Sequence, residues 1–174
     1  MSYRFDRLRV LIIDDNQHMR TLVSAVLEAF GVDFIFEAQS AEDGWKIFQQ
    51  NACDLIFVDW VMTGMSGLEF TEKVRTAPDS PNPFVPIVML TGHTSIERVN
   101  AARDAGVNEF LAKPVSSKAI LNRLVAVIEH PRPFVRTKSY FGPCRRRRRD
   151  GAYHGPERRA TDAEPQENIS ANAA

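Results

Sequence analysis

Residues 10–15 read VLIIDD, a short apolar run followed directly by the carboxylates of Asp14 and Asp15. An apolar run of this length, bounded by polar residues, is typical of a strand buried in a parallel sheet. Comparable runs recur roughly every 20–30 residues, at 34–36, 55–58, 85–90 and 107–111. This spacing predicts parallel strands joined by crossover helices.

Helical patterns fill the intervals between these runs. Apolar residues between Met19 and Phe30 recur at helical spacing, with Gly31 as the C-cap, and a last helix is expected at about residues 116–130. Three more helix starts carry the pattern of a capping box. These pairs are Ser40 and Asp43, Ser66 and Glu69, and Thr94 and Glu97. The alternation predicts an α/β fold, a doubly wound five-stranded parallel sheet with helices on both faces.

Three acidic residues stand where two of the predicted strands end, Asp14 and Asp15 after the first and Asp59 after the third. Functional groups in such sheets gather at the carboxyl ends of the strands. If the two strands are neighbours, the three carboxylates repel one another unless a cation offsets their charge. Because an all-oxygen site of this kind suits Mg²⁺, the sequence predicts a magnesium site at this edge.

The fourth and fifth predicted strands end in Thr91 and Lys113, which adds a hydroxyl and an ammonium group to the same edge. Phosphoryl transfer depends mostly on positioning and charge neutralisation, so this set of groups makes Asp59 a candidate nucleophile. Each residue also has a simpler interpretation. Asp14 or Asp15 would cap a helix, Asp59 would open a loop, Thr91 would start a turn, and Lys113 would be a solvated charge. Their joint placement favours a site.

Residues 8–130 resemble a response-regulator receiver domain of two-component signalling, of the single-domain chemotaxis type. The matching positions are Asp14, Asp15, Asp59, Thr91, Phe110 and Lys113-Pro114. Met62 and Gly67 match the loop after the family's phosphoacceptor, and Phe110 matches its switch aromatic. The resemblance implies the flavodoxin-like, doubly wound sheet and assigns residues 7–130 to the receiver domain.

By this resemblance, Asp59 accepts a phosphoryl group from a histidine kinase or a phosphotransfer protein. The chain would then be no enzyme, but a phosphoacceptor that supports its own phosphoryl transfer and dephosphorylation. Asp14, Asp15, Asp59 and the backbone carbonyl of Val61 would hold Mg²⁺, and Lys113 would contact a phosphoryl oxygen.

The resemblance also implies a two-state switch. Thr91 would swing toward the phosphoryl group and leave space for Phe110 to turn inward. The surface that changes would comprise the fourth helix, the fifth strand and the fifth helix, on which a downstream partner protein or a second copy of the chain would dock.

The formal net charge of zero is a cancellation between two parts of the chain. Residues 1–130 carry 12 Lys and Arg against 17 Asp and Glu, whereas residues 131–174 carry 10 against 5. This second part is rich in Pro, Gly and Arg and poor in periodic apolar residues, so we expect a tail that is extended or disordered. It contains a near-repeat, GPCRR at 142–146 and GPERR at 155–159.

The tail leaves two kinds of output open. It contains an arginine run made of Arg145, Arg146, Arg147, Arg148 and Arg149. This run would bind nucleic acid in a salt-sensitive manner, or it would be a solvated arm or contact a protein surface. The solvated arm and the protein contact are together favoured over nucleic acid. The tail has no periodic helices for a helix-turn-helix output domain. A hydrolase with an aspartyl nucleophile is the weakest alternative, because Val61 stands where its second catalytic acid is needed.

Cysteine content and hydropathy bear on the compartment. Cys53 and Cys144 lie far apart and have no CxxC or histidine companions, so neither a disulfide framework nor a zinc module is expected. No apolar stretch approaches the roughly 20 residues that span a bilayer. We therefore expect a cytoplasmic protein with reduced thiols and no membrane contact.

Overall fold

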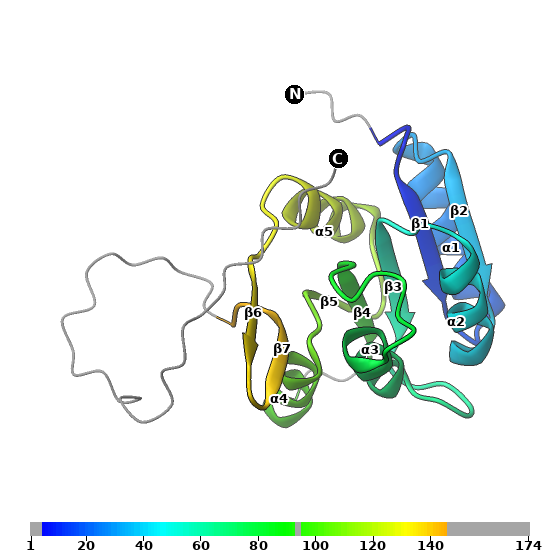
Figure 1. Ribbon diagram of the computed structural model, residues 1–174. Coiled ribbons are helices and arrows are strands. Elements are labelled where there is room, and N and C mark those ends of the chain that lie inside the picture. The colour runs from blue at the N-terminus through cyan, green and yellow to red at the C-terminus, as the bar shows by residue number, and fades with distance from the viewer. Residues whose placement is uncertain (1–4, 93–94, 146–174) are drawn as a thin grey trace, which may run out of the picture.

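The computed structural model describes residues 5–92 and 95–145, and its main feature is a sheet of five parallel strands. The strand order is β2-β1-β3-β4-β5 (Figure 1). The strands are β1 Arg9–Ile13, β2 Phe34–Ala38, β3 Leu55–Asp59, β4 Ile87–Thr91 and β5 Glu109–Ala112. The predicted α/β class and five-stranded parallel sheet are confirmed, and no strand end differs from its predicted position by more than two residues.

Five helices connect and follow these strands. They are α1 Gln17–Ala29, α2 Ala41–Gln50, α3 Gly67–Thr76, α4 Ile96–Ala105 and α5 Ser117–Ile128. Ser40 caps α2 by accepting the N–H of Asp43, and Ser66 forms a complete capping box with Glu69 before α3. Helix α4 begins after Ser95, and Thr94, which was expected to cap it, lies outside the described residues.

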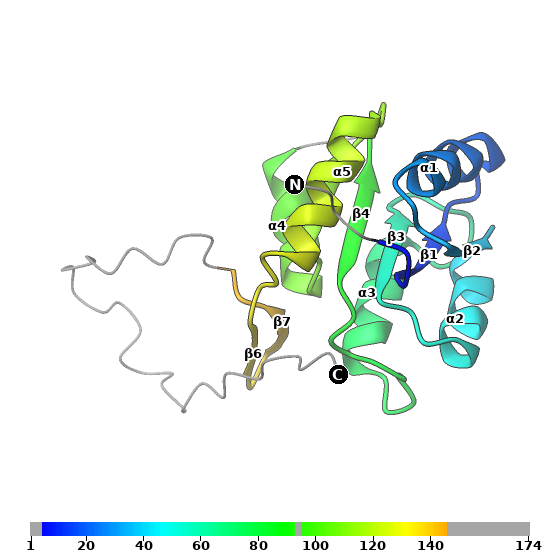
Figure 2. The same cartoon turned by 90° about the horizontal axis from the view of Figure 1, so that it is seen from above.

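The strands bury both faces, as the continuous apolar runs predicted. On one face, Leu11 and its neighbours pack against Trp45 and Phe48 of α2 and against Phe70 of α3. The opposite face packs against α1 and α5, where Leu124 belongs to the same buried cluster as Ile12. Figure 2 shows α1 and α5 on one side of the sheet and α2 and α3 on the other. This three-layer packing fixes the strand ends that carry the candidate site.

A β-hairpin follows α5, in the part of the chain where we expected an extended or disordered tail. Its strands β6 Phe134–Thr137 and β7 Tyr140–Pro143 are antiparallel and lie beside α3 and α4 (Figure 1). Sequence analysis missed the hairpin because residues 131–145 have too few apolar side chains for a core of their own. The hairpin instead uses the receiver as its core. Residues 146–174, the rest of the predicted tail, lie outside the described residues.

Three aromatic rings hold the hairpin against the loop before β4. The ring centroids of Phe134 and Phe141 lie 5.3 and 5.2 Å from that of Phe84, and 5.7 Å from each other. Phe134 is buried, although it comes from a short surface hairpin. Such tilted and edge-to-face pairs each add about 0.5–1.5 kcal/mol beyond the burial of their apolar area. The aromatic cluster therefore joins the two segments into one packed unit.

Arg75 at the end of α3 lies beneath this aromatic cluster and is buried. Its guanidinium donates to the carbonyl oxygens of Pro83, Val85 and Gly106 and to Oδ1 of Asn108, at 2.8–3.1 Å. Burial lowers the pKa of Arg75 to about 9, and these acceptors stabilise its charged form. One side chain thus connects α3, the loop before β4 and the start of β5.

The hairpin also makes a close backbone contact with the end of α4. A Cβ atom on Gly142 would lie 2.9 Å from the Cα atom of Gly106, and Gly106 itself has a φ of +98°. A side chain at Gly142 would therefore separate the two backbones. This contact explains the glycine in the first copy of the near-repeat at 142–146. The second copy lies outside the described residues.

No helix in residues 5–92 and 95–145 is long and apolar enough to cross a membrane.

Candidate functional site

The parallel strand order brings the three predicted carboxylates together. Strands β1 and β3 are paired in the register Ile13 with Val58, so the residues that follow them lie at the same edge of the sheet. Asp14, Asp15 and Asp59 each offer a carboxylate oxygen, and these oxygens all lie within 4.8 Å of one another. The convergence that the sequence predicted for these residues is present.

The three carboxylates differ in burial and in their partners. Asp14 is fully buried, Asp59 is 6% exposed, and Asp15 is exposed. The N–H of Asn16 donates to Oδ1 of Asp14 at 2.8 Å. Asn16 itself caps α1, because its side chain accepts the N–H groups of His18 and Met19. The simpler interpretation of Asp14 or Asp15 as the N-cap of this helix is therefore wrong.

Lys113 supplies a positive charge at the centre of this cluster. Its Nζ atom lies 2.9 Å from Oδ2 of Asp14 and 2.9 Å from Oδ1 of Asp59. The backbone N–H of Lys113 donates to the carbonyl of Thr91 at 2.8 Å, which joins the ends of β4 and β5. The peptide bond between Lys113 and Pro114 is cis. Lys113 is thus held at the site by its backbone as well as by its two carboxylate partners.

Burial and the neighbouring charges both shift the pKa values of Asp59 and Lys113. Burial raises the pKa of Asp59, with the nearby charge of Asp14 acting in the same sense and the hydrogen bond from Lys113 acting against it. Burial lowers the pKa of Lys113, but its bonds to Asp14 and Asp59 outweigh burial and the net shift is upward. The ammonium therefore stays charged and partly neutralises the pair of buried carboxylates.

The two residues of the predicted switch lie on one face of the sheet. Thr91 pairs in register with Ala112, and Phe110 precedes Ala112 by two residues, so Phe110 projects from the same face as Thr91. Thr91 is buried, whereas Phe110 is half-buried and packs against the cluster that contains Met89. This arrangement places the hydroxyl and the aromatic ring as diagonal neighbours on adjacent strands.

The loop after β3 passes close to the phosphoacceptor candidate. The N–H of Gly67 donates to the carbonyl of Trp60 at 3.1 Å. A Cβ atom on Gly67 would lie only 2.1 Å from the carbonyl oxygen of Asp59, so no side chain fits there. Val61, whose backbone carbonyl was the fourth predicted metal ligand, has a side chain that is 61% exposed.

Arg20 is a contact of the site that sequence reasoning did not select. Its Nη1 atom donates to the carbonyl oxygen of Asp14 at 2.7 Å, and its Nε atom lies 3.4 Å from Oε2 of Glu37 on β2. The side chain thus braces the turn between β1 and α1 from the outside. Nothing in the spacing marks this role, because an arginine on the polar side of an amphipathic helix is common.

The donor set fits a hard divalent cation. The cluster combines three carboxylates with one ammonium group, so it retains negative charge after Lys113 is counted. Oxygen-only ligands with an exposed member, Asp15, match the preference of Mg²⁺ for a few carboxylates and several waters. Asp14, Asp15 and Asp59 are the residues that would hold it.

The arginine run is only partly described. Arg145 lies away from the carboxylates, beside α4, where its Nη1 atom is 3.0 Å from Oδ1 of Asp104 and its guanidinium stacks over the ring of Tyr140. Arg146, Arg147, Arg148 and Arg149 lie outside the described residues. Of the five arginines in the run, the structure therefore gives contacts for Arg145 alone.

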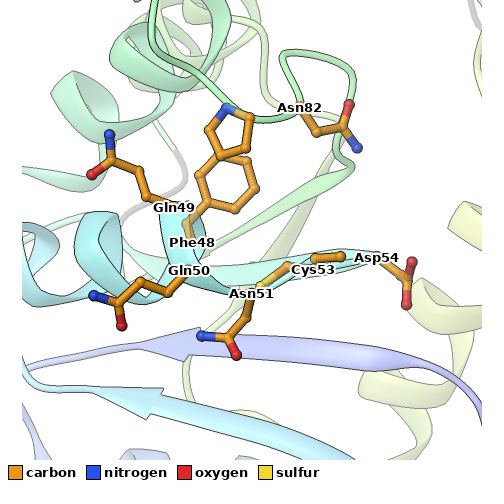
Figure 3. Close-up of a pocket in the computed structure, with 9 residues that line it drawn as sticks. Phe48, Gln49, Gln50, Asn51, Cys53, Asp54 and Asn82 are labelled. Carbon is orange, nitrogen blue, oxygen red and sulfur yellow. The ribbon is translucent and has the colours of Figure 1, made fainter.

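A hollow elsewhere on the surface does not belong to this site. It lies between the end of α2 and the start of β3, and Figure 3 shows Gln49, Cys53 and Asp54 among its lining residues. Asp54 is paired with Arg9, at 3.2 Å between the carboxylate and Nε. Because it lies at the amino end of β3, this hollow is at the opposite edge of the sheet from Asp59.

The fold and the site together define a doubly wound α/β domain with an acidic, lysine-bearing cluster at the carboxyl edge of its sheet. The chain belongs to the response regulator receiver domain family, whose model matches residues 10–125, two thirds of the chain. Members of this family act in phosphorylation-based signalling by two-component systems. Receiver domains are phosphoacceptors, bind Mg²⁺ at an acidic pocket and interact with histidine kinases and downstream proteins.

Two chemotaxis proteins illustrate the similarity. The chain is 30% identical over 122 residues to the chemotaxis protein CheY1 of Helicobacter pylori, covering 70% of this chain and 97% of that protein. The structure of the chemotaxis protein CheY4 of Vibrio cholerae matches with a TM-score of 0.64 and 31% identity, covering 69% of this chain and 98% of the other. These matches extend over nearly the whole length of the relatives but leave about 30% of this chain beyond them.

A longer relative places the same domain in another context. The phosphate regulon transcriptional regulatory protein PhoB of Pseudomonas aeruginosa is 27% identical over 124 residues, which cover 71% of this chain and 53% of that protein. The similarity to PhoB thus spans about half of that regulator.

Proposed function

We propose that this chain is a response regulator that receives a phosphoryl group on Asp59 from a phosphohistidine of a histidine kinase or a phosphotransfer protein. The observation that carries the proposal is the position of the Asp59 carboxylate. It lies 2.9 Å from the Lys113 ammonium, and its ligand oxygen is within 4.8 Å of those of Asp14 and Asp15. Family membership supports phosphoacceptor chemistry in general, and the Asp59 carboxylate, which is less deeply buried than that of Asp14, is our candidate for the acceptor.

In the transfer step, a carboxylate oxygen of Asp59 forms the new bond to phosphorus. The bond between phosphorus and the donor imidazole nitrogen breaks, and that nitrogen takes a proton from solvent. Lys113 releases one carboxylate contact and donates to a phosphoryl oxygen. Asp14, Asp15, Asp59 and the backbone carbonyl of Val61 would hold Mg²⁺, which would neutralise charge on the phosphoryl oxygens. Arg20 keeps the backbone of Asp14 in place while these charges rearrange.

The signal then leaves the site through the two switch residues. Thr91 moves its hydroxyl toward the phosphoryl group, and Phe110, its diagonal neighbour, turns into the space this opens. Phosphorylation acts here as a local charge that biases a two-state element. The surface that changes is the face of α4, β5 and α5, where a downstream protein or a second copy docks. The described residues after α5 form a hairpin beside α3 and α4, and we propose that output runs through protein contacts.

The experiment that tests the proposal is phosphorylation by a small acyl phosphate with MgCl₂, followed by intact mass spectrometry. One phosphoryl group should be added, and chelation of Mg²⁺ should abolish the addition. The Asp59→Asn variant should remain unlabelled, whereas Asp54→Asn, an exposed carboxylate at the opposite sheet edge, should be labelled like the wild type. Labelling of Asp59→Asn, or no labelling of the wild type, would refute the assignment of Asp59.

A further inference from the structure

A second group of charged side chains lies outside the carboxylate site, where the end of α4 meets the hairpin. Four residues line an open hollow of about 360 Å³ between these elements, and three of them are arginines. Val99 and Arg103 come from α4, Arg132 precedes β6, and Arg145 follows β7. The proposed phosphotransfer uses none of these residues.

The docked hairpin fixes two of the three guanidinium groups. Arg132 donates to the carbonyl of Asn108 at 2.9 Å and also to the carbonyl of Cys144. Arg145 stacks over the ring of Tyr140 with 4.0 Å between the guanidinium carbon and the ring centroid. Because these side chains are already ordered, a ligand would lose less entropy in immobilising them than it would at a mobile surface.

The charge of the hollow is positive and only partly offset. Asp104 pairs with Arg145 at 3.0 Å from the rim, with a side chain that is 62% exposed. Among the described residues, no acidic side chain lines the hollow itself. A single carboxylate satisfies one guanidinium fork, so a hollow lined by three arginines suits an anion with more charge and more acceptor oxygens.

We propose that this hollow is a binding site for a small molecule that carries two or more phosphate charges. Guanidinium groups donate pairs of parallel hydrogen bonds to phosphate oxygens, and phosphate presents several acceptors to converging donors. The volume lies within the range of roughly 300–1,000 Å³ that is typical of small-molecule sites, so there is room for more than a phosphate ion alone. An oligophosphate or a nucleotide shares the required chemistry.

The test is a titration of the full chain with pyrophosphate and, separately, with a nucleoside triphosphate, followed by amide chemical shifts. We expect saturable shifts at the end of α4 and in the hairpin. Arg103→Gln and Arg145→Gln should each weaken binding about tenfold, since each removes a charge-assisted hydrogen bond. Asp104→Asn should strengthen binding several-fold because it releases Arg145 from its carboxylate. Tighter binding of the triphosphate than of pyrophosphate would assign part of the site to the nucleoside.

Arg98→Gln is the matched control, because Arg98 is also on α4 but lies over the ring of Trp60 and not in the hollow. It should bind pyrophosphate like the wild type, and so should Asp59→Asn, since the hollow does not depend on phosphorylation. Unchanged binding by Arg103→Gln and Arg145→Gln would overturn the proposal. The proposal would also be overturned if the chain bound neither small ligand but bound a single-stranded oligonucleotide. That result would identify the arginines as a nucleic-acid contact.

Discussion

The Nζ atom of Lys113 bridges Asp14 and Asp59, at 2.9 Å from an oxygen of each. The bridge joins the end of β5 to the ends of β1 and β3, three strands that are not consecutive in the chain. It holds together two buried carboxylates that would otherwise repel each other. Lys113 therefore acts on the metal-free site as an internal cation.

Replacing Lys113 should lower the stability of the metal-free chain and raise its affinity for Mg²⁺. Lys113→Ala leaves two buried carboxylates without their cation, so we expect the free energy of unfolding to fall by about 1–3 kcal/mol in the absence of Mg²⁺. The added negative charge should raise the affinity for Mg²⁺. Urea unfolding with and without MgCl₂ measures both effects. Lys118→Ala, an exposed lysine on α5, is the control. Equal losses in the two variants would contradict the role assigned to the bridge.

A methyl group at Gly67 should push the start of α3 away from the phosphoacceptor strand. The added Cβ would lie 2.1 Å from the carbonyl oxygen of Asp59, and backbone atoms cannot rotate out of its way. Gly67→Ala should therefore cost about 1–3 kcal/mol of stability, despite the better helix propensity of alanine. Thermal unfolding measures the loss. Gly92→Ala meets no heavy atom within 4 Å and should cost less; equal costs would show that the close contact is relaxed in solution.

Substitution of Arg75 by lysine should be destabilising even though the charge is kept. An ammonium group cannot reach the acceptors of Pro83, Val85, Gly106 and Asn108 at once, so several buried acceptors would lose their donor. We expect a loss of about 1–3 kcal/mol for Arg75→Lys. Lys73→Arg on the same helix exchanges one cation for another over the ring of Trp45 and should leave the free energy of unfolding nearly unchanged in urea unfolding. If Arg75→Lys were as stable as the wild type, water would have to take the place of the guanidinium group.

Phe134→Ala should release the hairpin before it unfolds the receiver. The substitution removes the buried ring that contacts Phe84 and Phe141, so the docked state loses its main apolar contact. In amide hydrogen exchange, we expect protection to disappear in β6 and β7 while the amides of β1 and β3 stay protected. Thr137→Ala, at the exposed end of β6, should leave hairpin protection in place. Uniform loss of protection across the sheet would show that hairpin and receiver unfold as one unit.

The free energy of unfolding should fall at high pH because the Cys53 thiol is buried. The thiol is 5% exposed, and burial raises its pKa from 9.0 to about 11. Between these two pKa values the folded chain keeps the thiol protonated, whereas the unfolded chain ionises it. The thiol's contribution to the free energy of unfolding is therefore complete below pH about 9 and is lost as the pH rises through about 11. The difference in unfolding free energy between the wild type and Cys53→Ala should therefore shrink by up to about 3 kcal/mol over this interval.

Thiol alkylation offers an independent check on Cys53. Cys144 is only partly buried and should react with iodoacetamide first, whereas Cys53 should react only when the chain unfolds. Rapid modification of Cys53 in the folded chain would contradict both its burial and its raised pKa.

The sheet and the carboxylate site could be predicted because their signals are local. The apolar run of β1 ends at Asp14, that of β3 ends at Asp59, and parallel pairing alone brings such ends to one edge. Lys113 and Thr91 follow the same rule on β5 and β4. The positions of these residues followed from the strand ends alone. The resemblance to receiver domains was needed only to assign their roles.

The hairpin and its anchors could not be predicted in this way, because their contacts join distant parts of the chain. Phe84 and Phe134 are 50 residues apart, and neither lies in a periodic pattern that points to the other. Arg75 would be placed in solvent by any rule of composition, since arginine is rarely buried without a partner. Three of its four acceptors are backbone carbonyls, those of Pro83, Val85 and Gly106, and backbone carbonyls carry no residue-specific signal.

The shared core of hairpin and receiver constrains how such a chain can change through descent. Residue 84 lies within the receiver, whereas residues 134 and 141 lie in the extension, yet the three rings fill one space. Loss of the extension would expose Phe84 and open the surroundings of Arg75 to water. In lineages that lack the hairpin, we therefore expect polar residues at the position of Phe84 and a smaller or differently placed side chain at that of Arg75. We therefore expect substitutions in the extension and at residues 84 and 75 of the receiver to occur together.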